Sequence, residues 1–514
     1  MIDLRRFSNF ATTTAAAVEK PRRIKDDDRR FFSAGGEDPE THQGTSECNR
    51  SPELKTKKSI FVRLKNLYPQ CLAALAVWLI TLELGIMIVW SSPYLAQLTV
   101  PDSPLPLTLT EASWVASLLY IGRIIGAILG TYLVNEYGSR KTVLKTAAPM
   151  ALGWILTYCA TSPAYLYAAR ISLGIGFGLG YSGFALYLGE VAAPRIRGTL
   201  VSFAILGGSY GNLLVSFTGA NMSMQHTSIM YFVPCLCIMI LLLYLPDSPH
   251  HLAKLGKLDE ARKSLIWYRH SEDIDQELDG IVVYVKASTA SSFREKLGEF
   301  RKPHVRNATI LVMMLFAFMQ LSGLNNVMFY MEIILKNAHL DMIEPSSAVT
   351  YAIIASIVTG NLCVGLYDKF GRRLLLIMSS VNVSLSLAGL GAHFALESAG
   401  VQWVGSQWLP LLSIFAFITN FVVGLASIPS IVSSEVYSAD IKPVAACMAN
   451  LTAAAAAFLT SKAYQPMVDA YGEAFVFFTH AAITIMIVPF ALIFMPETKG
   501  KSLQQIQDLL MKKS

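Results

Sequence analysis

The hydrophobic and polar positions of the chain fall into long blocks. Twelve blocks are predominantly apolar and long enough for a helix that crosses a bilayer, which needs roughly 20 apolar residues. They predict membrane-spanning helices over residues 71–95, 113–136, 143–161, 164–188, 199–219, 228–246, 308–334, 347–367, 374–396, 408–433, 444–465 and 474–495. A polar stretch, 247–307, separates the sixth helix from the seventh. The expected fold is therefore an all-α membrane protein with twelve transmembrane helices in two six-helix halves.

The composition argues against a soluble enzyme. Of the 514 residues, 53% are hydrophobic and 15% are charged, whereas soluble domains carry about 25% charged residues. Seven cysteines, six of them inside apolar blocks, argue against a disulfide framework and against a zinc site. The spans hold no set of nucleophile, base and orienting residue. We expect neither an enzyme nor a cofactor, and the net charge of +6 indicates no nucleic-acid partner.

Lysine and arginine are divided unevenly between the two sets of loops, which predicts the orientation. In one set of loops only Lys336 is cationic. The other set carries nearly all the loop cations: 137–142, 189–198, 247–307, 368–373 and 435–443. Both termini and the linker 247–307 are therefore expected in the cytoplasm, in a multi-pass protein of the plasma membrane.

These loops and ends divide the chain into five parts. We expect a first half over 61–246, a cytoplasmic linker over 247–307, a second half over 308–498 and a cytoplasmic tail over 499–514. Residues 1–60 are expected to be a disordered cytoplasmic tail, because Met1–Ser59 is polar and shows no cleavable signal peptide. A transit peptide is the alternative interpretation of its Arg5-Arg6 and Ser/Thr/Ala-rich opening.

The polar loops of the two halves repeat one another. Gly138-Ser-Arg140 after span 2 corresponds to Gly371-Arg-Arg373 after span 8, and Glu190 after span 4 to Glu435 after span 10. Pro246-Asp-Ser-Pro249 after span 6 corresponds to Pro496-Glu-Thr-Lys499 after span 12. Repeated halves commonly hold a substrate site between them, near the middle of the bilayer, and work by rocking against each other.

The matched acids in these loops favour a network that opens and closes. Topology alone requires cations and gains little from Asp or Glu, whereas arginine–carboxylate bonds hold a closed state and dissolve when water enters. Loop charges that only set the topology are the alternative. The expected network, joining the halves when the cytoplasmic side is closed, comprises Arg140, Glu190, Arg197, Asp247, Asp368, Arg372, Arg373, Glu435 and Glu497.

These motifs and a few more, in this order over about residues 65–512, resemble the sugar porters of the major facilitator superfamily. The insect-type facilitated trehalose and glucose transporters are the nearest resemblance. The further motifs are Arg170, Gln320…Gly323-Leu-Asn325…Tyr330 and, for the insect-type proteins, Ala112-Ser113-Trp114-Val115, Glu260–Leu265 and Lys462. The resemblance implies uniport of a sugar through a central site, with short cytoplasmic helices in 250–300 that latch the halves.

The resemblance also implies which residues contact the sugar: Gln320, Asn325, Tyr330, Phe421 and Asn450. Amide groups both donate and accept hydrogen bonds, as a ring of hydroxyls requires. A break near Gly323 is expected to bring Gln320 and Asn325 together, because they lie about 140° apart on a regular helix. The chain departs from the family pattern at several positions, among them Asn135, Ser139, Ala185, Ile205, Met319, Ser430 and Lys442-Pro443.

Two charges inside the spans are not part of that pattern. Glu83 and Arg123 lie at nearly equal depth on sequence-adjacent antiparallel helices. Either charge alone would cost at least ~2.5–3.5 kcal/mol there. We therefore expect an intramembrane ion pair, the alternative being that each faces a wet cavity separately. His480, in the last span, is expected to be a hydrogen-bonded structural residue.

The function expected is transport of a neutral sugar such as trehalose, glucose or a related hexose or polyol. The mechanism expected is facilitated diffusion by alternating access, with the sugar and the lipid bilayer as partners and a monomer as the functional unit. Two alternatives stay open. One is proton-coupled symport, for which Glu83 is the candidate titratable group. The other is a sugar sensor that does not transport.

Overall fold

The structure is a computed structural model. It describes residues 52–194, 196–271, 273–289, 298–339, 342–401, 407–437, 441–499, 501, 505–506 and 509, without the side chains of 52–66, 287–289, 364–368 and 443. Most of the tail expected over 1–60, and much of that over 499–514, lies outside these residues. Every element of the described residues is helical.

The helices follow the order of the predicted spans. The first half contains α2 (Pro52–Val89), α3 (Ser91–Leu98), α4 (Leu109–Tyr137), α5 (Ser139–Tyr158), α6 (Pro163–Val191), α7 (Arg197–Asn221) and α8 (Met224–Tyr244). Three short helices follow: α9 (Pro249–Lys254), α10 (Leu258–Arg269) and α11 (Asp275–Thr289). The second half contains α13 (Pro303–Leu321), α14 (Leu324–Asn337), α15 (Pro345–Phe370), α16 (Arg372–Ser398), α17 (Trp408–Val423), α18 (Ile428–Val436), α19 (Lys442–Ile485) and α20 (Ile487–Ile493).

Ten apolar stretches of the described residues are long enough to cross a bilayer, and two of them are long enough to cross it twice. Leu109–Tyr158 and Val444–Ile493 each contain 50 residues, about 75 Å of helix against a hydrocarbon core of about 30 Å. Each turns in its middle, at Gly138 (φ +85°) and at Gly472 (φ +80°). The prediction of an all-α protein with twelve spans is therefore confirmed.

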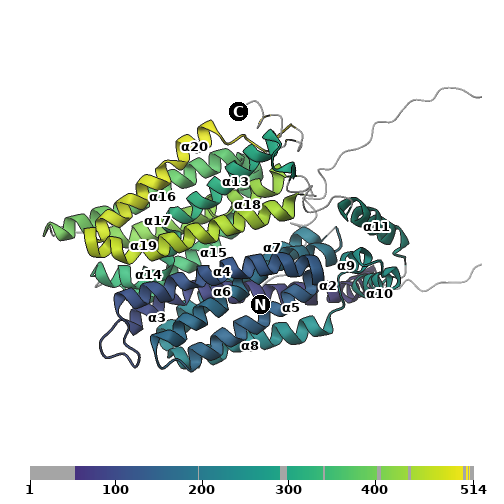
Figure 1. Cartoon of the computed structure of the whole chain (residues 1–514), viewed down its shortest axis with the longest axis horizontal. Coiled ribbons are helices and arrows are strands. Elements are labelled where there is room, and N and C mark those ends of the chain that lie inside the picture. Colours follow the sequence, from purple (N-terminus) through teal and green to yellow (C-terminus); the bar gives the residue numbers. More distant parts are fainter. Residues whose placement is uncertain are drawn as a thin grey trace, which may run out of the picture. The chain divides into compact units, whose positions relative to one another are not determined.

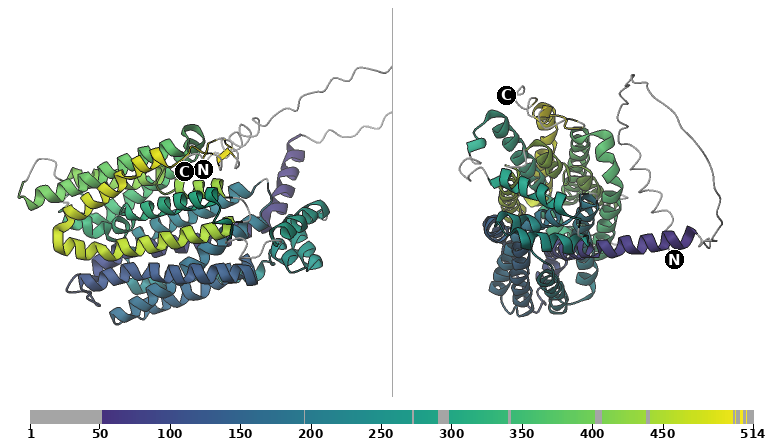
Figure 2. Two further views of the ribbon diagram at one scale, coloured as in Figure 1. Left: turned by 45° about the horizontal axis from the view of Figure 1, so that its top comes forward. Right: turned by 90° about the vertical axis from the view of Figure 1, so that its right-hand side faces the viewer.

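The two halves form separate groups of helices that meet at several helix pairs. α4 packs against α19, α3 against α14, and α7 against α15. Figure 2 shows the blue helices of the first half and the green and yellow helices of the second on opposite sides of the bundle. α9, α10 and α11 lie together at one end of the bundle, which we call the linker end (Figure 1).

Small residues allow close helix contact inside the first half. A Cβ on Gly122 would lie 2.2 Å from the carbonyl oxygen of Ile171, and one on Gly126 would lie 2.1 Å from that of Ile175. α4 and α6 therefore touch backbone to backbone, as small residues permit in membranes. This contact fixes the position of α4, whose other face meets the second half.

Candidate functional site

The seventh span is broken at Gly323. α13 ends at Leu321 and α14 begins at Leu324, and Gly323 between them has φ +83°. Glycine adopts this left-handed conformation without strain. A Cβ at this position would lie only 2.9 Å from Cγ of His480. The break that the sequence predicted near Gly323 is therefore present, and the side chain of His480, in the last span, packs against it.

The break brings two of the expected contact residues together. The Asn325 amide donates to Oε1 of Gln320 over 2.7 Å. Tyr120 of α4, in the other half, donates its hydroxyl to Oδ1 of Asn325. All three side chains are buried. A hydrogen-bonded amide cluster thus lies where the two halves meet, with one N–H of Asn325 and the donors of Gln320 available for other contacts.

His480 forms hydrogen bonds with both sides of the break and so connects α13 with α14. Its Nδ1 lies 2.9 Å from the carbonyl oxygen of Leu321, at the end of α13. Its Nε2 lies 2.9 Å from Nδ2 of Asn326, in the first turn of α14. Because a carbonyl only accepts, Nδ1 carries the hydrogen and Nε2 accepts from the amide. The prediction that His480 is a hydrogen-bonded structural residue is confirmed.

Two other expected contact residues lie in more apolar surroundings. Tyr330 stacks on Tyr464, with ring centroids 4.5 Å apart, and its buried hydroxyl has no hydrogen-bond partner among the described residues. Phe421 is buried in α17, where it packs against Phe417, and the helix ends shortly after it, before Gly424. The structure gives the aromatic surfaces but no hydrogen bond from either residue to the amide cluster.

Asn450 is the fifth expected contact residue, and it binds an arginine of the other half. Arg123 of α4 donates through Nε (3.1 Å) and Nη2 to Oδ1 of Asn450. The guanidinium lies 4.7 Å from the ring centre of Phe177 and 4.9 Å from that of Tyr181. Arg123 and Tyr120 are three residues apart and share one face of α4. This face therefore contacts the expected sugar-binding amides of both α14 and α19.

The expected ion pair between Glu83 and Arg123 is wrong for this structure. Glu83 is fully buried inside the first half and accepts a hydrogen bond from the indole N–H of Trp154 over 2.7 Å. Arg123 instead faces Asn450. Equal depth does not bring two residues together when they point from their helices in different directions. In α2, Glu83 points toward α5, whereas Arg123 points from α4 toward α19.

We expect that replacing Glu83 by glutamine, an uncharged amide, has little effect. Oε1 of Glu83 has no partner among the described residues, and an unpaired charge is costly in such buried surroundings. Glu83→Gln should keep the thermal midpoint, whereas Glu83→Leu leaves the Trp154 N–H unpaired and should cost about 1–3 kcal/mol. Thermal unfolding in detergent measures both variants. Equal damage from Gln and Leu would show that the negative charge itself is needed.

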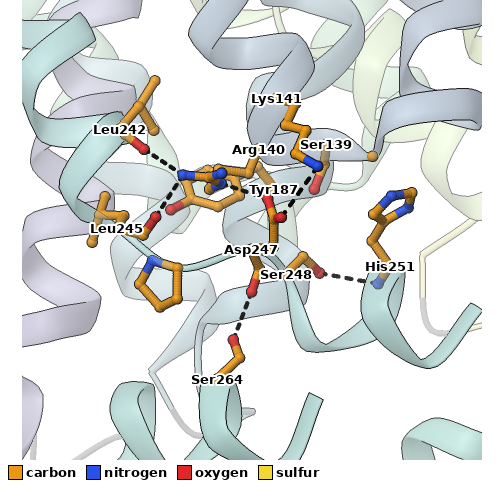
Figure 3. A network of polar contacts seen from close by, with 12 residues as sticks. Ser139, Arg140, Lys141, Tyr187, Leu242, Leu245, Asp247, Ser248, His251 and Ser264 are labelled. Atoms are coloured by element: carbon orange, nitrogen blue, oxygen red, sulfur yellow. Dashed lines mark hydrogen bonds and ion pairs between the residues drawn. The ribbon is translucent and has the colours of Figure 1, made fainter. Parts of the chain in front are cut away.

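The loop motifs of the first half form one polar cluster at the linker end (Figure 3). Arg140 donates through Nε to Asp247 over 2.6 Å, and through Nη1 to the carbonyls of Leu242 (2.7 Å) and Leu245 (2.6 Å) at the end of α8. Lys141 lies 3.4 Å from the same carboxylate. The cluster thus ties the start of α5 to the end of α8.

The second half repeats this arrangement with matching residues. Arg373 donates through Nε to the carbonyl of Ala491 over 3.0 Å, and its backbone N–H donates to Glu497 over 3.1 Å. Arg372 pairs with Glu435 over 2.9 Å. Burial raises the pKa of Glu497, but the backbone N–H groups around it lower the pKa further, so that it lies below its ordinary value. The carboxylate is therefore fixed in its charged form.

The bonds of each cluster join residues of a single half. Glu190 accepts from Ser139 in the first half. Arg197, the first residue of α7, is exposed and forms no ion pair with another described residue. The side chain of Asp368 lies outside the described residues. No bond within the described parts joins the clusters, so a network across the halves stays a prediction for the closed state.

The chain matches a known family along most of its length. A family model described as "Sugar (and other) transporter" covers residues 71–510. The chain belongs to the sugar transporter family. Among its relatives, the facilitated trehalose transporter Tret1 of Culex quinquefasciatus is 29% identical over 86% of this chain and 85% of its own length. The protein of that name from Bombyx mori is 28% identical over 89% of both chains.

Other relatives are longer. The chain spans 55% of the length of Tret1 from Aedes aegypti and 52% of that from Drosophila mojavensis, at 29% identity. Among solved structures, the proton:xylose symporter XylE of the major facilitator superfamily matches 87% of this chain and 100% of its own, with a TM-score of 0.69 and 21% identity. The inward open XylE from E. coli gives 0.66 and 21%, over 86% of this chain and 98% of XylE. The fold is that of this superfamily.

One departure from the internal repeat lies next to the matching glycines of the two clusters, at Ser139 and Arg372. Arg372 pairs with Glu435 in the second half, while at the matching place in the first half Ser139 bonds Glu190. Ser139 keeps a hydrogen bond to the glutamate, but it cannot form the ion pair that Arg372 forms.

The described residues contain no group of three or more His, Cys, Asp or Glu side chains that could hold a metal ion.

Tyr120 and Asn326 were missed by the sequence analysis. Both belong to the site by their contacts, Tyr120 with Asn325 and Asn326 with His480. Asn326 is adjacent to an expected contact residue, so a second buried amide in the same turn was the available signal. Tyr120 had no such signal, because its role depends on which face of α4 meets the other half.

Proposed function

We propose that this protein transports a sugar across the plasma membrane by facilitated diffusion, with alternating access to a site between its halves. The observation that carries the proposal is the amide cluster of Gln320 and Asn325 at the break of the seventh span. Broken helices with free polar groups at the repeat interface are the usual substrate sites of such transporters. The relatives' names, facilitated trehalose transporters, support trehalose or glucose as the substrate.

The orientation proposed puts the linker end in the cytoplasm. α9–α11 and the two arginine clusters lie at this end, and positive loops mark the cytoplasmic side. A monomer is proposed as the functional unit. The clusters are proposed to meet, and so to close the cytoplasmic side, in another step of the cycle.

Proton coupling has less support than uniport. Glu83 is buried inside the first half and bonds Trp154, away from Tyr120, Arg123 and the amides that they contact. A coupling carboxyl group has to be reached from the substrate path. The likeness to the XylE symporter concerns the fold and supplies no coupling residue here.

Gln320→Ala should weaken sugar binding. Losing one hydrogen bond in a buried site costs roughly 1–3 kcal/mol, a factor of about 5 to 150 in the half-saturation concentration. Uptake of labelled trehalose, glucose and sorbitol into oocytes measures this. Asn361→Ala is the matched control, since that exposed amide bonds the Ile357 carbonyl of its own helix and no other group of the described residues.

The same assay separates transport from sensing. Saturable uptake that Gln320→Ala weakens and Asn361→Ala leaves unchanged supports the proposal. An unchanged half-saturation concentration and maximal rate in Gln320→Ala would reject the site. Binding of a sugar without any uptake would favour the sensor.

A further inference from the structure

Arg123 places a positive charge in the middle of the membrane. It lies fourteen residues from each end of α4, about 21 Å along the helix. Charged residues at this depth are rare and mark pathways for substrates or ions. Its side chain is 7% exposed and reaches Asn450 of the other half, so it lies at the interface and not on the lipid face.

No carboxylate in the part of the chain that the structure describes balances this charge. None of the ion pairs formed within the described residues includes Arg123, and Glu83 is turned toward Trp154. The guanidinium is held by one amide oxygen and the faces of Phe177 and Tyr181. These groups carry partial negative charge only. A full negative charge is missing.

Arg170 is a second buried arginine of this bundle, and its contacts stay within one half. It is 1% exposed and donates to the Met87 carbonyl over 2.9 Å and to the Ser91 hydroxyl, and it covers the Trp90 ring. All of these partners belong to the first half, which Arg170 ties together internally. Arg123 differs because its hydrogen bonds cross to the other half.

Donors of Arg123 remain available for a ligand. Both N–H groups of Nη1 are without a hydrogen bond to any described residue, whereas Nε and Nη2 share one oxygen of Asn450. Tyr181, whose ring lies against the guanidinium, is a residue that is 47% exposed, so Arg123 lies beside an open part of the structure. A ligand held by the site amides would meet these donors.

We infer that the site prefers a sugar that carries one carboxylate, such as a uronate or an aldonate, over the neutral parent sugar. The inference rests on the proposed function, since it names the substrate class of that same site. A carboxylate accepts two parallel bonds from a guanidinium and supplies the missing charge. The hydroxyls are left for Gln320 and Asn325. A phosphate is less suitable, because it carries up to two charges at pH 7 and meets only one arginine.

The test compares glucuronate with glucose in voltage-clamped oocytes that express the full chain. Hydrogen bonds to charged groups are worth more than neutral ones, so glucuronate should compete for uptake at a concentration about ten- to a hundredfold lower than glucose. Facilitated entry of an anion moves charge. Glucuronate should therefore evoke a saturable current, and glucose should evoke none.

Variants assign the preference to Arg123. Arg123→Gln should abolish the preference and Arg123→Lys should keep part of it. Lys145→Gln is the matched control, because that exposed cation covers the Tyr137 ring at 3.8 Å away from the site. If Arg123→Gln does not reach the surface, the wild-type comparison alone decides.

The outcomes for the two proposals differ. Glucose uptake without preferential competition by glucuronate, and without a glucuronate current, overturns the inference and leaves sugar transport standing. A preference that survives in Arg123→Gln also overturns it. If neither sugar is bound or transported, the proposed function itself fails.

Discussion

Arg140→Ala is expected to be the most damaging single change at the linker end. It removes one ion pair to Asp247 and two hydrogen bonds to the last carbonyls of α8. Removing one partner of a buried pair costs 3–5 kcal/mol. Because Asp247 keeps a fifth of its side chain exposed, we expect a loss of about 3 kcal/mol, near the lower end of that range. A lower thermal midpoint in detergent, with less protein at the cell surface, measures this.

Lys141 offers a matched control for Arg140. It is the next residue, bonds the same carboxylate at 3.4 Å, and its side chain is 43% exposed. Exposed ion pairs contribute only about 0–1 kcal/mol, so Lys141→Ala should leave the midpoint nearly unchanged. Equal losses from the two variants would mean that charge alone matters, and that the carbonyl contacts at the end of α8 do not.

Gly323→Ala should impair transport even though it adds one methyl group. The left-handed backbone at Gly323 costs an alanine about 1–2 kcal/mol. The new Cβ would lie 2.9 Å from the His480 ring. A displaced ring loses its bonds to Leu321 and Asn326, each worth about 0.5–1.5 kcal/mol. We expect a lower thermal midpoint and a maximal transport rate reduced more strongly than surface expression.

Gly472 separates the two causes. Its φ of +80° is combined with a ψ of 167°, a region that essentially only glycine adopts, so alanine pays a backbone penalty there at least as large as at Gly323; nothing, however, lies within 4 Å of a Cβ placed there. Gly472→Ala should therefore lose stability through the backbone alone and keep its transport rate per molecule at the surface. A Gly323→Ala protein that transports as well as Gly472→Ala would contradict the role of His480 at the break.

Much of the fold could be predicted because each membrane-spanning helix is visible in the sequence as a local run of apolar residues. The repeat also proved structural: Gly138 and Gly371 have the same φ of +85°, and each is covered by a side chain that follows the last span of its half, His251 and Glu497 respectively. Short-range patterns of this kind need no knowledge of packing. The break at Gly323 was predictable for the same reason, since one glycine between two expected contact residues marks it.

Contacts between helices could not be predicted in this way. The pairing of Glu83 with Arg123 was inferred from depth, but a contact also depends on the direction in which each side chain leaves its helix. The partner of Glu83 is Trp154, and that of Arg123 is Asn450, 327 positions away. The sequence contains the residues of the site, and the packing of α4 against α19 decides which of them meet.

The most direct test of the proposed transport is uptake of labelled trehalose and glucose by the purified protein in liposomes, with and without a proton gradient. Facilitated diffusion predicts saturable entry that stops when the inside concentration equals the outside concentration, whatever the gradient, and a raised half-saturation concentration in Gln320→Ala. Entry no faster than in protein-free liposomes, or accumulation above the outside concentration that depends on the proton gradient, would contradict it.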